Sequence, residues 1–309
     1  MPLPALFQDR LRLPLIGAPM FIVSQPDLVI AQCRAGVVGC FPTLNARPLP
    51  QLEAWLEQLT AATREPGVAP FGANLIVHKA NARQAEDLEL IIKHKVPFVI
   101  TSVGDPTPVV ERVHAYGGIV FHDVISLKHA RKAIAAGVDG LILVCAGAGG
   151  HAGTLSPFAF VAEVRKIFAG AIVLSGAISY GNHIKAAQVI GADLAYMGTR
   201  FIATAEAHAQ DEYKKMIVDA GTADIVYTPY FSGVYANYLR SSIAASGLDP
   251  AQVLGERPGA QLSLGSDDSK GPKAWRDIWS AGQGAGAIDD VPTVAQLVDR
   301  LKAQYDSAG

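Results

Sequence analysis

Cysteine is scarce in this sequence of 309 residues, and the three cysteines present are scattered. Cys33, Cys40 and Cys145 show no metal-ligand spacing and form no C-x-x-C pair. An odd and sparse set of cysteines is typical of a reducing compartment rather than of a disulfide-stabilised scaffold. We therefore expect neither structural disulfides nor a metal site.

The sequence also has few charged residues and no long apolar run. Only 17% of the residues are charged and the net charge is −2, so no basic field would hold nucleic acid or an anionic membrane. The longest apolar runs have the length of a strand, which is too short to cross a bilayer. The N-terminus lacks the basic stretch and long apolar run of a signal peptide. These absences predict a cytoplasmic protein with no nucleic-acid or membrane partner.

Several common catalytic motifs are missing. H-E-x-x-H, the P-loop and Gly-x-Ser-x-Gly do not occur. The carboxylates show no paired spacing suited to glycoside hydrolysis. The sequence thus argues against a zincin-type metalloprotease, a P-loop NTPase, a nucleophile elbow and a glycosidase.

The first 200 residues alternate between short apolar runs and helical patterns. The apolar runs show little alternation of polar and apolar residues, as expected of strands covered on both faces. Glycine stops several of the helical patterns, and Ser126 and Ser156 are candidate N-caps. We predict strands at 13–18, 37–41, 71–77, 98–102, 119–123, 140–145, 172–175 and 194–197, and helices at 25–35, 49–63, 82–94, 106–116, 126–136, 157–168 and 180–190.

Eight strands with intervening helices fit a (β/α)8 TIM barrel. A doubly wound sheet uses the same alternation, but no G-x-G-x-x-G turn follows the first strand, which favours the barrel. After residue 205 the pattern changes to a helix at 207–219, an aromatic-rich stretch and a polar loop at 255–273. We predict a barrel formed by residues 1–205 and 280–309, closed by a helix at 293–305. Residues 206–279 would form an insertion or lid subdomain over the barrel mouth.

Two glycine-rich strand ends are candidates for a phosphate site. Ser175-Gly176-Ala177 and Gly198-Thr199 follow the seventh and eighth strands, where barrels often bind phosphate through backbone N–H groups. Glycines that merely permit tight turns are the alternative. Arg200 either adds positive charge or is a solvated or paired residue.

The loop of residues 146–153 surrounds one histidine with four glycines. These glycines allow the backbone to approach a flat or anionic ligand. His151 can exchange a proton near neutral pH, so it is the candidate catalytic residue. A structural histidine bonded to a loop carbonyl is the alternative.

Three other positions have less decisive settings. Met20, after Pro19, offers a soft apolar surface to a ring system, although a core methionine fits equally well. Asn74 is an amide in an apolar strand and needs a bonding partner, either a ligand or a neighbouring turn. The segment 279–286 contains Gln283 among glycines and could return the chain to the barrel mouth. The aromatic residues from Tyr227 to Tyr238 suit a pocket wall, a core or a subunit interface.

Taken in order, six segments carry a resemblance to a known family. The chain resembles the nitronate monooxygenases, also called 2-nitropropane dioxygenases, nearly end to end. The segments are Gly17-Ala18-Pro19-Met20, Gly72-Ala73-Asn74-Leu75, Gly149-Gly150-His151-Ala152-Gly153, Leu174-Ser175-Gly176-Ala177-Ile178, Met197-Gly198-Thr199-Arg200-Phe201 and Ser280-Ala281-Gly282-Gln283-Gly284. Members of that family often have Gly-Gly-Met in place of residues 18–20 and Ser-Gly-Gly in place of residues 175–177.

The resemblance implies an FMN-dependent flavoenzyme and a role for each matched residue. Pro19, Met20 and Phe21 would line the isoalloxazine, and Gly149 and Gly150 would pass close to it. Asn74 and Asp123 would bond the flavin or its ribityl chain. Ser175, Gly176, Ala177, Gly198 and Thr199 would hold the phosphate, Gln283 would approach the cofactor, and His151 would lie beside flavin and substrate.

The function that follows is oxidation of alkyl nitronates by O2, giving a carbonyl compound and nitrite, with neutral nitroalkanes as a second form of substrate. His151 would either bind the anionic nitro group as imidazolium or remove a Cα proton. An NAD(P)H-dependent flavin reductase of quinones or enoyl thioesters is the first alternative. A non-redox barrel that binds a phosphorylated ligand is the second. The oligomeric state stays open, with a homodimer as one expectation.

Overall fold

The computed structural model describes residues 3–256 and 273–309, and its main sheet has eight parallel strands. Each predicted strand is confirmed to within two residues at either end. The strands are β1 (Leu15–Gly17), β2 (Gly39–Pro42), β3 (Phe71–Ile76), β4 (Phe98–Ser102), β5 (Ile119–Val124), β6 (Gly140–Val144), β8 (Ala171–Ser175) and β9 (Leu194–Met197).

The sheet closes on itself. Its order is β1-β9-β8-β6-β5-β4-β3-β2, and a bridge between Ile16 and Val38 joins the two end strands. The N–H of Gly17 donates to the carbonyl of Val38 at 2.7 Å across this seam. The fold is therefore the predicted TIM barrel, and the doubly wound alternative is wrong because an open sheet would leave these edges apart.

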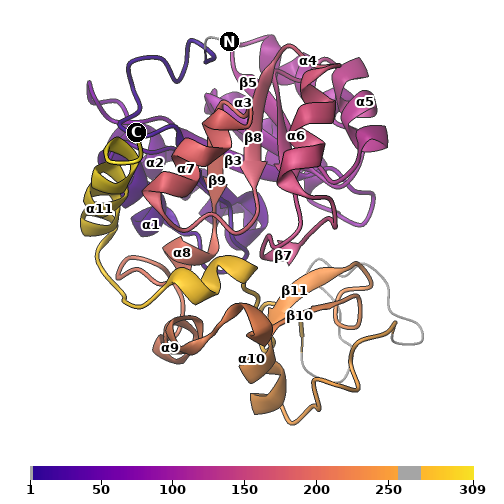
Figure 1. Ribbon diagram of the computed structural model, residues 1–309. Coiled ribbons are helices and arrows are strands. Elements are labelled where there is room, and N and C mark those ends of the chain that lie inside the picture. Colours follow the sequence, from indigo (N-terminus) through magenta and orange to yellow (C-terminus); the bar gives the residue numbers. More distant parts are fainter. Residues whose placement is uncertain (1–2, 257–272) are drawn as a thin grey trace.

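Helices surround the barrel, as Figure 1 shows. The helix at the C-terminal end packs against α7 and α1, which fills the last place in the ring and confirms the predicted closing helix. No helix in the described ranges is long and apolar enough to cross a membrane. The outer helices are α1 (Pro26–Arg34), α2 (Leu49–Ala62), α3 (Gln84–Lys93), α4 (Thr107–His114), α5 (Leu127–Ala135), α6 (Pro157–Arg165), α7 (Gly181–Val189) and α11 (Val294–Asp306).

Helix starts follow the sequence signals only in part. The hydroxyl of Ser126 accepts from the backbone N–H of His129 at 3.2 Å, which confirms this N-cap. Ser156 occupies the predicted N-cap position of α6, but its side chain makes no cap hydrogen bond. Proline at the first position of α6 already removes one N–H that a cap would have to satisfy.

The interior of the barrel is filled at its N-terminal end. Phe7 is almost completely buried and packs edge-on against Phe98 and Phe121, with ring centroids 5.3 and 6.0 Å apart. Together with Ile16, Ile142 and other apolar side chains it forms one cluster. Because this end is packed, a ligand can enter only where the strands end, at the opposite mouth.

A smaller lobe lies beyond that mouth (Figure 1). Strands β10 (Ile225–Thr228) and β11 (Ala236–Leu239) form an antiparallel pair, and β7 (Gly150–His151) from the barrel loop joins the edge of β11. The lobe also contains α9 (Asp211–Asp219) and α10 (Arg240–Ala245). Short helical turns complete the chain: η1 (Thr43–Asn45), α8 (Thr199–Ile202), η2 (Thr222–Asp224) and η3 (Gln283–Ala287).

Three aromatic residues of this lobe belong to its own core. Tyr238 is fully buried with Val226, Ile243 and Ile278, and Tyr230 and Phe231 pack against that cluster. For Tyr230, Phe231 and Tyr238 the structure supports a core, whereas Tyr227 and Tyr235 contact each other outside this cluster and Tyr235 is exposed. The division at residues 206 and 279 stays a prediction, and most of the polar loop at 255–273 lies outside the described residues.

Candidate active site

A cavity of about 520 Å³ opens at the carboxyl ends of the barrel strands. Because parallel strands end at the same rim, side chains far apart in sequence meet there. All the candidate residues except Gln283 line this cavity. They are Pro19, Met20, Phe21, Asn74, Asp123, Gly149, Gly150, His151, Ser175, Gly176, Ala177, Gly198 and Thr199.

Gln283 is exposed and does not line the cavity, although Gly282 and Gly284 on either side of it do. Its N–H donates to the carbonyl of Gly147 at 2.9 Å. The segment therefore returns the chain to the barrel mouth through its backbone. The contact of the Gln283 side chain with a cofactor stays a prediction.

The tips of β8 and β9 place unused backbone donors side by side. Gly176 and Ala177 both have a positive φ, 129° and 53°. The N–H groups of Gly176, Ala177, Gly198 and Thr199 donate to no other group in the described part of the chain. The Thr199 hydroxyl is held in place because it accepts from the N–H of Gly282 at 2.9 Å. Such an arrangement suits an anion.

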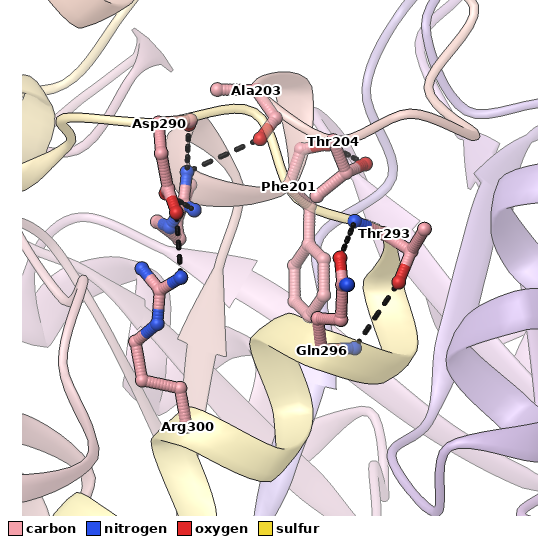
Figure 2. A network of polar contacts seen from close by, with 8 residues as sticks. Phe201, Ala203, Thr204, Asp290, Thr293, Gln296 and Arg300 are labelled. Atoms are coloured by element: carbon pink, nitrogen blue, oxygen red, sulfur yellow. Dashed lines mark hydrogen bonds and ion pairs between the residues drawn. The ribbon is translucent and has the colours of Figure 1, made fainter.

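Arg200 does not contribute to this corner. Its side chain is only 3% exposed and donates to an Asp290 carboxylate oxygen at 2.7 Å. Arg300 donates to the other oxygen of Asp290 at 2.5 Å, and Thr293 caps α11 beside it (Figure 2). Of the two roles left open for Arg200, the structure supports the paired one. Arg200 ties α8 to the segment that leads into α11.

A row of polar side chains crosses the ends of β3, β4 and β5. Asn74 donates from Nδ2 to Ser102 Oγ at 2.8 Å, and Ser102 Oγ donates to Asp123 Oδ2 at 2.5 Å. Asp123 Oδ1 is buried and has no partner within the described residues. Burial raises the pKa of Asp123 to about 6, and the Ser102 bond opposes this only in part. A residue that lines the cavity thus has an unsatisfied acceptor. The sequence did not identify Ser102 as a site residue because serine is common at strand ends.

The loop after β1 is locked by a residue that the sequence did not single out. Asn45 donates from Nδ2 to the carbonyls of Met20 (3.0 Å) and Ser24 (2.8 Å), and its Oδ1 accepts from the N–H of Ile22 at 2.8 Å. Ile22 has a φ of 68°, which a β-branched residue adopts only under constraint. The clamp thus holds Met20 and Phe21 at the cavity wall.

His151 lies at the junction of barrel and smaller lobe. Its Nε2 is 3.1 Å from Ser232 Oγ, and its ring packs edge-on against Trp275 with centroids 5.1 Å apart. Burial lowers the pKa of His151 to about 4, so the imidazole is neutral at pH 7. Ser232 and Trp275 were missed because they lie more than 80 residues away in the sequence, in the smaller lobe. The pairing of β7 with β11 brings that lobe against His151.

Comparisons with known proteins identify the family of this chain. A family model described as nitronate monooxygenase matches residues 81–304. The chain belongs to the nitronate monooxygenase family. It is accordingly an enzyme of that family, and the resemblance read from the sequence is confirmed.

Two curated relatives show how far the likeness extends. A nitronate monooxygenase from Paraburkholderia phytofirmans is 26% identical over 98% of this chain and 95% of its own length. A (3aS,4S,5R,7aS)-5-hydroxy-7a-methyl-1-oxo-octahydro-1H-indene-4-carboxyl-CoA dehydrogenase from Mycobacterium tuberculosis is 28% identical. That match covers 74% of this chain but only 64% of the relative.

Solved structures support the fold. FabK from Thermotoga maritima is 24% identical with a TM-score of 0.78, covering 96% of this chain and 93% of that one. A nitroalkane oxidase from Streptomyces ansochromogenes is 22% identical with a TM-score of 0.76, covering 98% and 99%. At these identities the likeness shows the TIM-barrel architecture and no more.

Proposed function

We propose that the chain catalyses the FMN-dependent oxidation of alkyl nitronates by O2 to carbonyl compounds and nitrite. The observation that carries this is the position of His151 on a cavity whose other walls suit a flavin. Membership of the nitronate monooxygenase family supports it. The proposed substrates are small molecules, a nitronate or nitroalkane and O2.

The residues present fit FMN. Four unused N–H groups at Gly176, Ala177, Gly198 and Thr199 suit its phosphate. The unpartnered Oδ1 of Asp123 suits a donor on the ring or the ribityl chain. Gly149 and Gly150 line the cavity with backbone alone, and the cavity volume lies in the range of cofactor sites, about 300–1,000 Å³. When bound, FMN would take electrons from the substrate and deliver them to O2.

The state of His151 favours one of its two candidate roles. A neutral imidazole cannot offer a full positive charge to a nitronate, but it can accept a proton from the Cα of a neutral nitroalkane. Its lowered pKa keeps it in the neutral form that the second role needs at pH 7. We therefore assign His151 as the base that removes the Cα proton of a neutral nitroalkane. A nitronate needs no base because its Cα has already lost the proton.

The smaller lobe is assigned as a subdomain over the mouth, spanning residues 206–279. Val234 and Trp275, which lie in this segment, line the cavity. Both are apolar, so they would shield the reacting atoms from water on the side away from the barrel.

Anaerobic mixing tests the proposal. The FMN-loaded protein is mixed without air first with a nitronate and separately with NADH, while the flavin absorbance is followed. Bleaching by the nitronate but not by NADH, followed by nitrite release when air is admitted, is the expected result. Rapid bleaching by NADH alone would contradict it.

A flavin reductase that uses NAD(P)H is the second candidate. It is favoured by the 28% identity to a dehydrogenase named for a CoA thioester. A protein that stays colourless after incubation with FMN would contradict both candidates and favour a non-redox barrel that binds a phosphorylated ligand.

A further inference from the structure

Ser232 Oγ lies at the centre of three contacts in the smaller lobe. It is 3.1 Å from His151 Nε2, it donates to the carbonyl of Val234 at 3.0 Å, and it accepts from the phenol of Tyr238 at 3.3 Å. Ser232 is 1% exposed and Tyr238 is 0% exposed. The hydroxyl of Ser232 and the side chain of Tyr238 are therefore shielded from bulk water.

Only one assignment of protons makes all three contacts of Ser232 hydrogen bonds. A serine hydroxyl has one proton to donate and two lone pairs to accept with. The Val234 carbonyl can only accept, so in this assignment it takes the proton of Ser232. The two lone pairs then accept from Tyr238 and from His151, which requires a proton on Nε2 of the imidazole.

A neutral imidazole with its proton on Nε2 has a lone pair on Nδ1. Among residues 3–256 and 273–309, Nδ1 of His151 has no hydrogen-bond partner, and the residue lines the cavity. The edge-on contact with Trp275 restricts rotation of the ring. The proton-accepting atom therefore has a set position.

We propose that Ser232 and Tyr238 are positioning residues that hold His151 in the Nε2-protonated tautomer and so present Nδ1 to the substrate. In the step that this serves, the Cα–H bond of a neutral nitroalkane breaks, the proton forms a bond with Nδ1, and the electron pair stays on the substrate as the nitronate. Nε2 keeps its bond to Ser232 throughout. The role in catalysis rests on the proposed function, whereas the tautomer does not.

The tautomer is read directly by two-dimensional ¹H–¹⁵N NMR of FMN-loaded protein labelled at histidine, with the His151→Gln variant to assign the signals. The expected pattern at pH 7 is a protonated Nε2 and an unprotonated Nδ1. A proton on Nδ1 would overturn the proposal. Because this measurement needs no turnover, it gives an answer even if the enzyme does not oxidise nitroalkanes.

Kinetics separate positioning from folding. Ser232→Ala removes the acceptor, so kcat for a neutral nitroalkane should fall about tenfold or more, within the range that a displaced general base loses. KM for the nitroalkane and turnover of the preformed nitronate should change little. Ser232→Thr keeps a hydroxyl and should restore most of the rate, and Tyr238→Phe should give a smaller loss than Ser232→Ala.

Ser242→Ala is the matched control. Ser242 is a buried serine of the same lobe that accepts from the N–H of Trp279 at 2.8 Å and does not contact His151. A rate loss in Ser242→Ala equal to that in Ser232→Ala would mean that destabilised packing is responsible. Equal losses on nitronate and nitroalkane in Ser232→Ala would also overturn the proposal. An unmodified enzyme that uses neither substrate would instead contradict the proposed function.

Discussion

The backbones of Gly149 and Gly282 are in direct contact, although 132 residues separate them. A Cβ atom placed on Gly149 would lie 2.9 Å from the nitrogen of Gly282, and one placed on Gly282 would lie 2.8 Å from the nitrogen of Gly149. Two glycine-rich segments thus support each other where the chain returns to the barrel mouth. This contact holds the loop that carries His151 against the tip of β9, through the bond from Gly282 to Thr199.

Gly282→Ala should separate these two segments. Its Cβ would also lie 2.5 Å from the carbonyl oxygen of Gly147, and neither neighbour is a flexible side chain. We expect a loss of about 1–3 kcal/mol in the free energy of unfolding and weaker FMN retention. Urea denaturation and flavin release measure the two effects. Gly255→Ala, where a Cβ meets nothing within 4 Å, is the control. Equal behaviour of both variants would contradict the close contact.

The pH dependence of nitroalkane oxidation should follow His151. Its pKa is lowered to about 4 by burial, so the neutral base form prevails as pH rises above that value. We expect kcat/KM for a neutral nitroalkane to rise between about pH 3 and 5 and then stay level to pH 8. His151→Asn should lower kcat by about 10²–10⁴ and remove the inflection.

Activity that declines as pH rises through 4 would instead indicate that the imidazolium form is required. Parallel profiles with a preformed nitronate serve as the control for this prediction, because that substrate needs no proton removal.

Asp123 should make the protein less stable as pH rises. Its folded pKa of about 6 lies above the ordinary value of 3.8, so between these values the unfolded chain has lost a proton that the folded chain retains. Stability therefore falls through this window. Two pKa units correspond to about 3 kcal/mol, which we reduce to about 1–2 kcal/mol because the carboxyl borders an open cavity.

Asp123→Asn keeps an acceptor for Ser102 but cannot ionise. In protein prepared without FMN, its advantage over the unmodified chain should therefore grow from pH 4 to pH 7. Urea denaturation at the two pH values measures it. An advantage that shrinks with rising pH would show that the carboxylate is stabilised rather than destabilised by its surroundings.

Ala177→Gly should stabilise the fold. Ala177 has a φ of 53°, a conformation that costs a residue with a Cβ about 1–2 kcal/mol. Glycine removes that cost but adds unfolded-state entropy, so the expected net gain is about 0.5–1 kcal/mol. Thermal denaturation measures it. Ala187→Gly inside α7 is the opposite control, with an expected loss of about 1 kcal/mol or more. A loss in Ala177→Gly would contradict the strain.

The sequence by itself determined the barrel and the composition of its rim. Its strands are continuous apolar runs buried on both faces, and glycine ends several of its helices, so local pattern and burial requirement agree. Because parallel strands end on one rim, His151 and Gly176 could be assigned to one cavity from their places at strand ends, whereas the roles of Asn74 and Asp123 came from the family resemblance.

Only the tertiary structure decided how those residues are held. The pairing of β7 with β11 places Ser232 against His151. Strand β7 has only two residues, which is too short to be predicted from a local sequence pattern. Asn45 holds the Met20 loop by hydrogen bonds, and Arg200 forms an ion pair with Asp290. Both contacts join segments that are distant in the sequence. Hydrogen-bond partners and pKa values depend on such neighbours and on burial, which periodicity along the chain does not encode.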